Sequence, residues 1–260
     1  MGNVLILNYH RIIDDERECV DDSILTDKQT VKKADLINQL NSIQAAGIPI
    51  IALDHWNKGD FQDQFAVALT FSGGHKSDSE IVLPLLKSLG LTATFFPTLS
   101  IIDTKEGVTW KDLKSIIDNG MEIGSQGVSG QNLRRISKNA CQLELELSKR
   151  IIENNLGKKV VFFAPSSGNY NRRLLQLAYN AGYQKVLTNR AKINTNTHTL
   201  LQHRFTVKAN TNISTLEKLI VKGLLSHSKR PLYAKLSSLL SVEFGIGIFN
   251  KEYINGYSRW

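Results

Sequence analysis

The side chains with the clearest chemical potential are six histidines and two cysteines, which could bind a metal or transfer protons. Cys19 and Cys141 lie far apart, and no Cys-x-x-Cys spacing marks a structural zinc site or a disulfide framework. His75 has only Asp78 and Glu80 near it, on a predicted loop that runs into a helix. Because this spacing supplies no tetrahedral ligand set, we expect no zinc site here.

Nucleophilic catalysis is a second candidate chemistry. A nucleophilic pair of Ser72 with a histidine would need an orienting acid, and the sequence shows neither that acid nor a Gly-x-Ser-x-Gly turn. His203 stands at the start of a predicted strand beside Arg204, where a structural role and a proton-transfer role both remain open. Sequence spacing alone therefore assembles no replacement catalytic set.

These side chains must be positioned by an alternation of short apolar runs and longer helical segments. The apolar runs are rich in β-branched residues and predict strands over residues 4–8, 48–52, 66–71, 92–96, 121–125, 160–164, 185–188 and 204–207. Helical periodicity predicts helices over residues 31–46, 77–89, 109–119, 138–155 and 172–181. This alternation predicts parallel βα units, closed as a barrel or open as a doubly wound sheet.

The rhythm changes after residue 207. Two further helices are predicted over residues 214–226 and 232–240, and a glycine-bearing apolar segment follows at residues 244–249. An amphipathic cap packed on the domain explains the first helix, and a basic helix for a protein partner or a membrane surface is the alternative. We therefore expect a main domain over residues 1–207 and a helical C-terminal cap over residues 208–260.

Composition excludes several classes of protein. The 260 residues are 42% hydrophobic, with 18 glycines and 5 prolines, so collagen-like and proline-rich disordered chains are excluded. No apolar run approaches the roughly 18 residues of a membrane helix. Residues 1–65 carry a net charge of −5 and the remainder +13, but the basic residues are scattered rather than interleaved with aromatics. We expect a soluble globular protein that does not bind nucleic acid.

Several short motifs follow one another along the chain. Residues 67–74 read Val-Ala-Leu-Thr-Phe-Ser-Gly-Gly, residues 122–127 read Glu-Ile-Gly-Ser-Gln-Gly, and residues 163–171 read Phe-Ala-Pro-Ser-Ser-Gly-Asn-Tyr-Asn. With Asn-Tyr-His-Arg at residues 8–11, they resemble the motifs of the polysaccharide deacetylases, the NodB-homology family or carbohydrate esterase family 4. The resemblance spans residues 4–207 and implies a distorted parallel (β/α) barrel.

The resemblance also implies a reaction. Active members of the family remove N-acetyl or O-acetyl groups from glycans with a divalent metal, usually zinc. One Asp and two His bind the metal, which polarises the acetyl carbonyl and activates a water. A second Asp is the base for that water, and a later His protonates the leaving group.

This chain departs from the family pattern at each of those positions. The two Asp of the first motif correspond to Ser72, the position of the base, and Gly73, a metal-ligand position. The two metal-binding His correspond to Gln126 and Gly130. Glycine has no donor atom, and neutral Ser or Gln binds zinc poorly compared with imidazole or carboxylate. We therefore predict that the chain binds no metal in the family manner.

The supporting positions differ as well. The Arg that orients the base corresponds to Ala164, and a Pro-Tyr pair of the third motif corresponds to Ser166 and Ser167. Leu201, Gln202 and His203 fit the family's final Leu-x-His, so His203 is a candidate catalytic acid. The pattern as a whole predicts a protein that has lost metal-dependent deacetylation.

A neutral, hydrogen-bonding groove is the expected remnant. Parallel barrels gather ligand-contacting groups at the carboxyl ends of their strands. The groove residues predicted in this way are Ser72, His75, Gln126, Ser129, Ser166, Ser167 and Tyr170. Such groups suit sugar hydroxyls and amides, with Tyr170 or Trp110 as stacking faces. We expect a glycan-binding or regulatory pseudoenzyme whose partner is an N-acetylated polysaccharide; a vestigial pocket without a ligand is the alternative.

Two further functional hypotheses stay open. One is an active hydrolase with a rearranged site, and the other is an interaction scaffold that uses the basic C-terminal cap. The first residues lack the basic leader of a signal peptide, so a cytoplasmic location is the default expectation. If a leader peptide has been removed from the sequence, a secreted or cell-envelope location is expected instead.

Overall fold

The computed structural model describes residues 2–14, 27–62 and 64–227, and its centre is a seven-stranded parallel sheet. The strand order is β6-β5-β4-β1-β9-β8-β7. The seven strands are β1 (Asn3–Tyr9), β4 (Phe65–Gly73), β5 (Thr94–Pro97), β6 (Glu122–Ile123), β7 (Phe162–Phe163), β8 (Lys185–Thr188) and β9 (Leu201–Thr206). Each lies at or within a few residues of a predicted strand.

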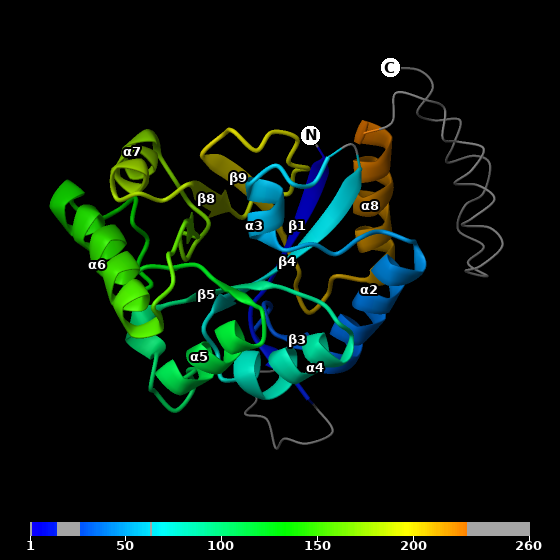
Figure 1. Cartoon of the computed structure of the whole chain (residues 1–260), viewed down its shortest axis with the longest axis horizontal. Coiled ribbons are helices and arrows are strands. Elements are labelled where there is room, and N and C mark those ends of the chain that lie inside the picture. The colour runs from blue at the N-terminus through cyan, green and yellow to red at the C-terminus, as the bar shows by residue number, and fades with distance from the viewer. Residues whose placement is uncertain (1, 15–26, 63, 228–260) are drawn as a thin grey trace.

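The two edges of this sheet meet and close it into a barrel. Ser125, which follows β6, forms a parallel bridge with Phe163 of β7. The Ser125 N–H donates to the Phe162 carbonyl at 3.0 Å, and the Ala164 N–H donates to the Ser125 carbonyl at 2.9 Å. Figure 1 shows the strands in the middle, with α6 and α7 on one side and α2 and α8 on the other. The predicted distorted parallel barrel is thereby confirmed.

Two apolar clusters fill the inside and the outside of the barrel wall. Val4 and Ile6 of β1 belong to the inner cluster, whereas Leu5 and Leu7 belong to the outer one. This division follows from the two-residue alternation of strand side chains. On β9 it directs Arg204, which pairs in register with Ile6, into the barrel. The same alternation directs its neighbours on the strand outward.

Helices cover the outer face. They are α2 (Lys33–Ala45), α4 (Leu83–Ser88), α5 (Trp110–Asp118), α6 (Lys138–Leu156), α7 (Arg172–Asn180) and α8 (Ile213–His227), with a short α3 (Leu53–Asn57). Caps explain several of the starts: the Ser137 hydroxyl accepts from the Ala140 N–H, and Thr109 forms a capping box with Asp112. The predicted helices over 109–119, 138–155 and 172–181 are confirmed.

Three predicted elements differ from the structure. The strand expected over 48–52 is a single bridge between Ile50 and Val67, because the Pro49 nitrogen has no hydrogen to extend the ladder and α3 begins at Leu53. The helix expected over 77–89 begins as a π-helical turn, Asp78–Val82. The helix expected from residue 31 begins two residues later, because Val31–Lys32 forms β3 and pairs with β2 (Ile12–Ile13).

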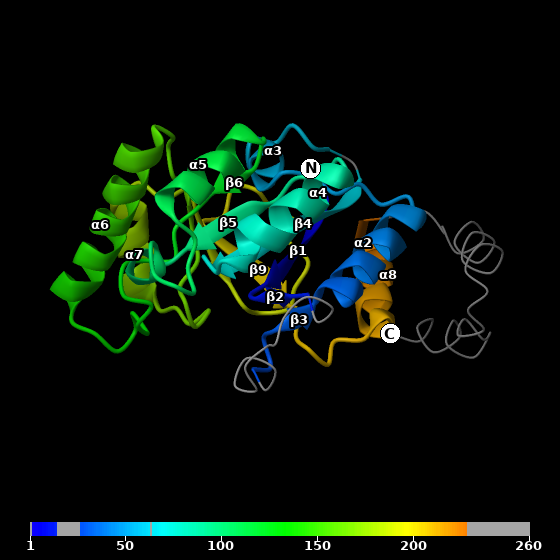
Figure 2. The same cartoon turned by 90° about the horizontal axis from the view of Figure 1, so that it is seen from below.

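The described part of the C-terminal region is one helix, α8, which lies beside α2 in both views (Figures 1 and 2). Leu216 and Ile220 are buried in the outer core. Gly223 allows a close approach, since a Cβ there would lie 2.1 Å from the Phe65 ring. The predicted helix over 232–240 and the segment over 244–249 lie outside the described residues. No helix in the described ranges has the length and apolar character needed to cross a membrane.

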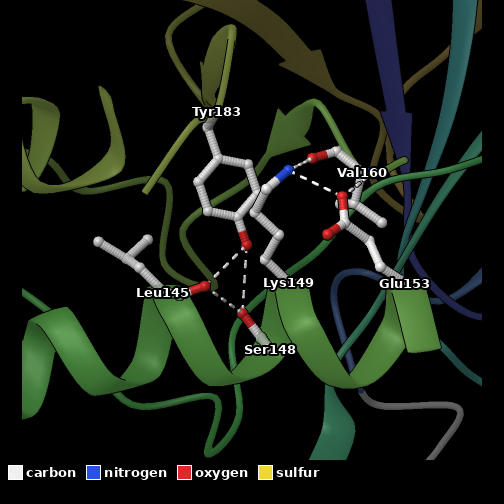
Figure 3. A network of polar contacts seen from close by, with 6 residues as sticks. All are labelled: Leu145, Ser148, Lys149, Glu153, Val160 and Tyr183. Carbon is white, nitrogen blue, oxygen red and sulfur yellow. Dashed lines mark hydrogen bonds and ion pairs between the residues drawn. The ribbon is translucent and has the colours of Figure 1, made fainter. Parts of the chain in front are cut away.

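A buried tyrosine joins α6 to the start of β8. The Tyr183 hydroxyl donates to the Leu145 carbonyl at 3.1 Å and lies 3.3 Å from the Ser148 hydroxyl (Figure 3). Burial raises the pKa of Tyr183 to about 12, so the hydroxyl keeps its proton and remains a donor over the physiological range.

A compensated charge completes the same contact, and we call the whole set the α6 network: Leu145, Ser148, Lys149, Glu153, Val160 and Tyr183 (Figure 3). The Lys149 ammonium pairs with Glu153 at 3.0 Å, donates to the Val160 carbonyl and lies 5.2 Å from the centre of the Tyr183 ring. Glu153 in turn accepts from the Val160 N–H at 2.8 Å. Every polar group in this contact therefore has a partner.

Candidate functional site

A hydrogen-bond network connects polar groups that lie on, or directly follow, the four strands β1, β4, β8 and β9. We call it the mouth network: Asn8, His10, Ser72, Asn189 and Arg204. The Ser72 hydroxyl donates to Asn8 Oδ1 at 2.8 Å. Arg204 donates from Nη1 to Ser72 Oγ at 2.9 Å and from Nη2 to Asn189 Oδ1 at 2.9 Å. The network lies inside the barrel because these strand residues share the inward-facing register.

Arg204 is the charged group of the mouth network. It is fully buried, and its guanidinium carbon lies 5.4 Å from the centre of the Phe96 ring. Burial lowers the pKa of Arg204 to about 9, which still leaves it charged at neutral pH. Its Nε has no hydrogen-bond partner. Over the described ranges, 2–14, 27–62 and 64–227, no carboxylate pairs with it.

His10 forms the exposed end of the network. Its Nε2 lies 3.3 Å from Asn8 Nδ2. With the Asn8 amide nitrogen as donor, Nε2 is the acceptor and the ring proton is on Nδ1, an assignment that follows from the amide orientation. Burial lowers the pKa of His10 to about 3, and the positive charge of Arg204 adds to the shift. His10 is therefore neutral at pH 7.

His75 lies on the loop after β4, above the position that the family uses for a metal ligand. Its Nδ1 is 3.5 Å from Arg11 Nη2, and Arg11 pairs with Glu106 at 3.2 Å. Burial, followed by the charge of Arg11, lowers the pKa of His75 to about 4. A Cβ built on Gly73 would lie 2.6 Å from His75 Nε2, and Gly73 has φ +114°. The backbone conformation therefore favours glycine at position 73, and a side chain there would require the His75 ring to move.

The other two family ligand positions lie close together near Thr98. The Thr98 hydroxyl donates to Gln126 Oε1 at 3.0 Å, which engages the oxygen that could otherwise face a cation. Gly130 has φ +72°, and a Cβ there would lie 3.5 Å from Thr98 Cγ2. Space is available at Gly130, but its backbone conformation disfavours a side chain.

These residues do not fit the family's divalent metal. Gly73 and Gly130 supply no side-chain donor, and the amide oxygen of Gln126 is already bonded. Among the residues described, no group of three or more His, Cys, Asp or Glu side chains is arranged to hold a metal ion. We therefore derive no catalytic step through a metal.

The loops of the second and third motifs are brought together. The Ser166 hydroxyl donates to the Gly130 carbonyl at 2.6 Å. The N–H of Ser129 donates to Glu144 of α6 at 3.1 Å, which ties the second-motif loop to that helix. Ser167 is exposed, and Tyr170 packs, partly buried, against the outer core.

Three other residues singled out from the sequence make no side-chain hydrogen bond to the mouth network. Ala164 is buried inside the barrel. Strand alternation places His203 on the opposite face of β9 from Arg204, and its Nδ1 lies 3.1 Å from the Thr188 hydroxyl. Trp110, at the start of α5, packs against the outer core. The structure therefore does not bring His203 to Ser72.

Sequence reasoning missed the residues that surround Ser72: Asn8, Asn189 and Arg204. A signal was available for one of them, because polar Gln202, Arg204 and Thr206 alternate along β9. Such alternation marks an inward-facing polar row. Recognising that row required the correct strand bounds, which begin at residue 201 rather than 204.

The described residues also line two cavities at the amino ends of the strands, opposite the mouth network. One, of about 580 Å³, is lined by residues such as Glu122, Lys159 and Phe162. The other, of about 570 Å³, is lined by residues such as Tyr179 and His198. Neither contains a predicted groove residue. In parallel barrels this end usually contributes to stability rather than to ligand chemistry.

Comparison with known proteins agrees with the motif order and the barrel. The family model described as polysaccharide deacetylase matches residues 60–186. Over residues 60–186 the chain is therefore similar to the polysaccharide deacetylase family. YxkH of Bacillus subtilis (strain 168), provisionally named as a polysaccharide deacetylase, is 27% identical over 122 residues, which are 47% of this chain. The match covers 44% of YxkH, so it spans less than half of that relative.

Solved structures of polysaccharide deacetylases share the fold. The Streptococcus pyogenes deacetylase PplD, in complex with acetate, aligns with a TM-score of 0.74 and 20% identity, over 84% of this chain and 97% of PplD. A de-N-acetylase from Aggregatibacter actinomycetemcomitans aligns with a TM-score of 0.72 and 19% identity, over 84% of this chain and 99% of that enzyme. At this identity the likeness establishes the fold.

Proposed function

We propose that this polysaccharide deacetylase-like protein binds an acetylated polysaccharide at the carboxyl end of its barrel without removing the acetyl groups. One observation supports this most directly. At the family's base and ligand positions stand Ser72, whose hydroxyl is held between Arg204 and Asn8, and Gly73, whose only space for a side chain is filled by His75.

The chemistry of these groups explains the loss of hydrolysis. A general base must accept a proton from water near the operating pH, which a carboxylate or imidazole does and a serine hydroxyl does not. The Ser72 hydroxyl donates its hydrogen bond to Oδ1 of the neutral Asn8 amide, so no base activates it as a nucleophile either. What remains beside the charged Arg204 is a set of neutral donors and acceptors of the kind that hold sugar hydroxyls and amides.

Hydrolysis is tested with the full chain after incubation with zinc and desalting. We expect a zinc stoichiometry near zero and no acetate release from N-acetylglucosamine oligomers above the rate in buffer. A stoichiometry near one, with acetate release that a chelator stops, would overturn the proposal and point to a ligand set around His75 or His203.

Binding is tested by titration with an N-acetylglucosamine pentamer. Ser167→Arg places a bulky side chain at an exposed position on the third-motif loop, and we expect it to weaken binding at least tenfold. Ser115→Arg makes the same change at an exposed position of α5, near the amino ends of the strands, and should leave affinity unchanged. Equal affinity for the two variants would place the glycan elsewhere.

A further inference from the structure

The buried guanidinium of Arg204 has no counter-charge. A charge removed from water normally has an ion partner, because desolvation is costly and the interior screens it poorly. The described partners of Arg204 are a hydroxyl, an amide oxygen and an aromatic face, all neutral. Burial lowers the pKa of Arg204, and no carboxylate of the described residues contributes to that shift.

Its hydrogen-bonding capacity is also only partly used. A guanidinium has five N–H donors. The two bonds to Ser72 and Asn189 use two of them, and Nε has no partner although it is buried. Unused donors beside an uncompensated charge are the features expected of an anion receptor.

The surroundings add positive charge, and the described acids near the mouth are not paired with Arg204. Asp27, whose charge acts on both His10 and His75, is exposed. Arg11 is on the same side of the barrel, bonded to His75, and its partner Glu106 is mostly exposed. Asp78, a buried acid whose N–H donates to the His75 carbonyl, has its pKa raised by burial, which favours the uncharged form. His10 and Asn189, at the two ends of the mouth network, are both partly exposed, so the network reaches solvent on either side of the guanidinium.

We propose that Arg204 makes the mouth of the barrel a binding site for a carboxylate. A planar, two-oxygen anion matches the fork of N–H groups on a guanidinium better than a spherical ion does. This inference deepens the proposed function: the polysaccharide is one that bears acidic sugars, and Arg204 binds the acid group of one of them. Free acetate shares the same chemistry.

The test is calorimetric titration of the full chain at fixed ionic strength in chloride buffer. The probes are methyl glucuronide, the neutral methyl glucoside, and sodium acetate. We expect the glucuronide to bind at least tenfold more tightly than the glucoside. Acetate binding as tightly as the glucuronide would assign the site to a free carboxylate, and weaker acetate binding would assign it to an acidic sugar. Equal affinity for glucuronide and glucoside would overturn the proposal.

Asn189→Asp supplies an internal counter-ion. Its carboxylate would stand where Asn189 Oδ1 now lies, 2.9 Å from Arg204 Nη2. We expect at least a tenfold loss of glucuronide affinity together with a higher melting temperature, a combination that misfolding would not produce. Asn180→Asp makes the same charge change at the exposed end of α7 and should bind like the wild type. Wild-type affinity in Asn189→Asp would overturn the proposal.

Arg204→Gln gives a second readout, because it removes the charge while keeping a polar side chain. We expect loss of the preference for glucuronide over glucoside. In the wild-type chain, binding of N-acetylglucosamine oligomers without any preference for the carboxylate would refute the carboxylate site and leave the proposed function standing. Binding of the glucuronide without binding of the N-acetylglucosamine oligomers would support the carboxylate site and refute the proposed function.

Discussion

The mouth network and the α6 network both hold a cation against an aromatic ring, but only one of them balances the charge. Lys149 has the Glu153 carboxylate at 3.0 Å, and both also bond to Val160. Arg204 has only neutral partners among the described residues, and its Nε has none. The two networks thus separate a charge used for packing from a charge left available to a ligand.

This contrast shows where stability and function diverge in the molecule. A satisfied network joins α6 to β7 and β8, and its loss would simply weaken the fold. An uncompensated buried charge lowers stability in the free protein, a cost typical of binding and catalytic sites. Substituting the two cations by the same residue is therefore the most direct way to test the comparison.

The largest expected effect is a difference in sign between Arg204→Met and Lys149→Met. Arg204→Met removes a buried charge that has no ion partner among the described residues, so we expect it to raise the free energy of unfolding. Lys149→Met removes a satisfied hydrogen bond and ion pair and should lower it by about 1 kcal/mol. Urea unfolding measures both. A loss of stability in Arg204→Met would mean that its charge is already balanced.

The second largest effect is expected from acid, which should lower the free energy of unfolding through the histidines at the mouth of the barrel. Folding lowers the pKa of His10 from 6.5 to about 3 and of His75 to about 4, so the unfolded chain binds protons first as the pH falls. Stability should therefore drop between pH 6.5 and 4, by about 3 kcal/mol from His10 at about 1.4 kcal/mol per pKa unit. His10→Gln should flatten this slope relative to His55→Gln, an exposed control on α3. Identical slopes would contradict the assignment.

Gly73→Ala comes third. Its positive φ costs roughly 1–3 kcal/mol for a residue with a side chain, and the contact with His75 adds to this. Gly47→Ala has φ +66° but nothing within 4 Å of the new Cβ, so it should cost less. Combining His75→Ala with Gly73→Ala should recover part of the stability lost in Gly73→Ala. Combining it with Gly47→Ala should recover none of the stability lost there. Thermal unfolding of the four variants decides this.

The smallest effect is expected in the α6 network. Tyr183→Phe removes one hydroxyl that donates to Leu145 and lies beside Ser148, and we expect a loss of about 1 kcal/mol. Glucuronide affinity should stay unchanged, because the α6 network is separate from the mouth. A change in affinity would show that the two networks are coupled.

The sequence predicts most strands and helices well because the strands are short, apolar and regularly separated by amphipathic helices. Their closure into a barrel is implied by the family resemblance rather than by this alternation. The prediction fails where pairing depends on a neighbour in space. Residues 48–52 look like a strand, yet Pro49 and the start of α3 limit them to one bridge. The π-helical turn over Asp78–Val82 likewise follows from tertiary packing rather than from periodicity.

The candidate site is predictable only in part. Motif spacing locates Ser72, Gly73, Gln126 and Gly130. The absence of carboxylate and imidazole groups at these positions follows from residue type alone. The hydrogen-bond partner of Ser72 does not follow from residue type. Arg204 is 132 positions away, and the face of β9 on which it lies depends on which residue begins that strand. A one-residue shift in that strand would exchange the faces of Arg204 and His203.

The contact between His75 and Gly73 makes the two positions interdependent in evolution. Because the imidazole occupies the space above the Gly73 Cα, the Cβ of a residue introduced at position 73 would lie 2.6 Å from His75 Nε2. The ring must turn away, or residue 75 must be replaced, before a side chain at position 73 has room. The route back to a metal-binding barrel therefore involves position 75 as well as the ligand positions themselves.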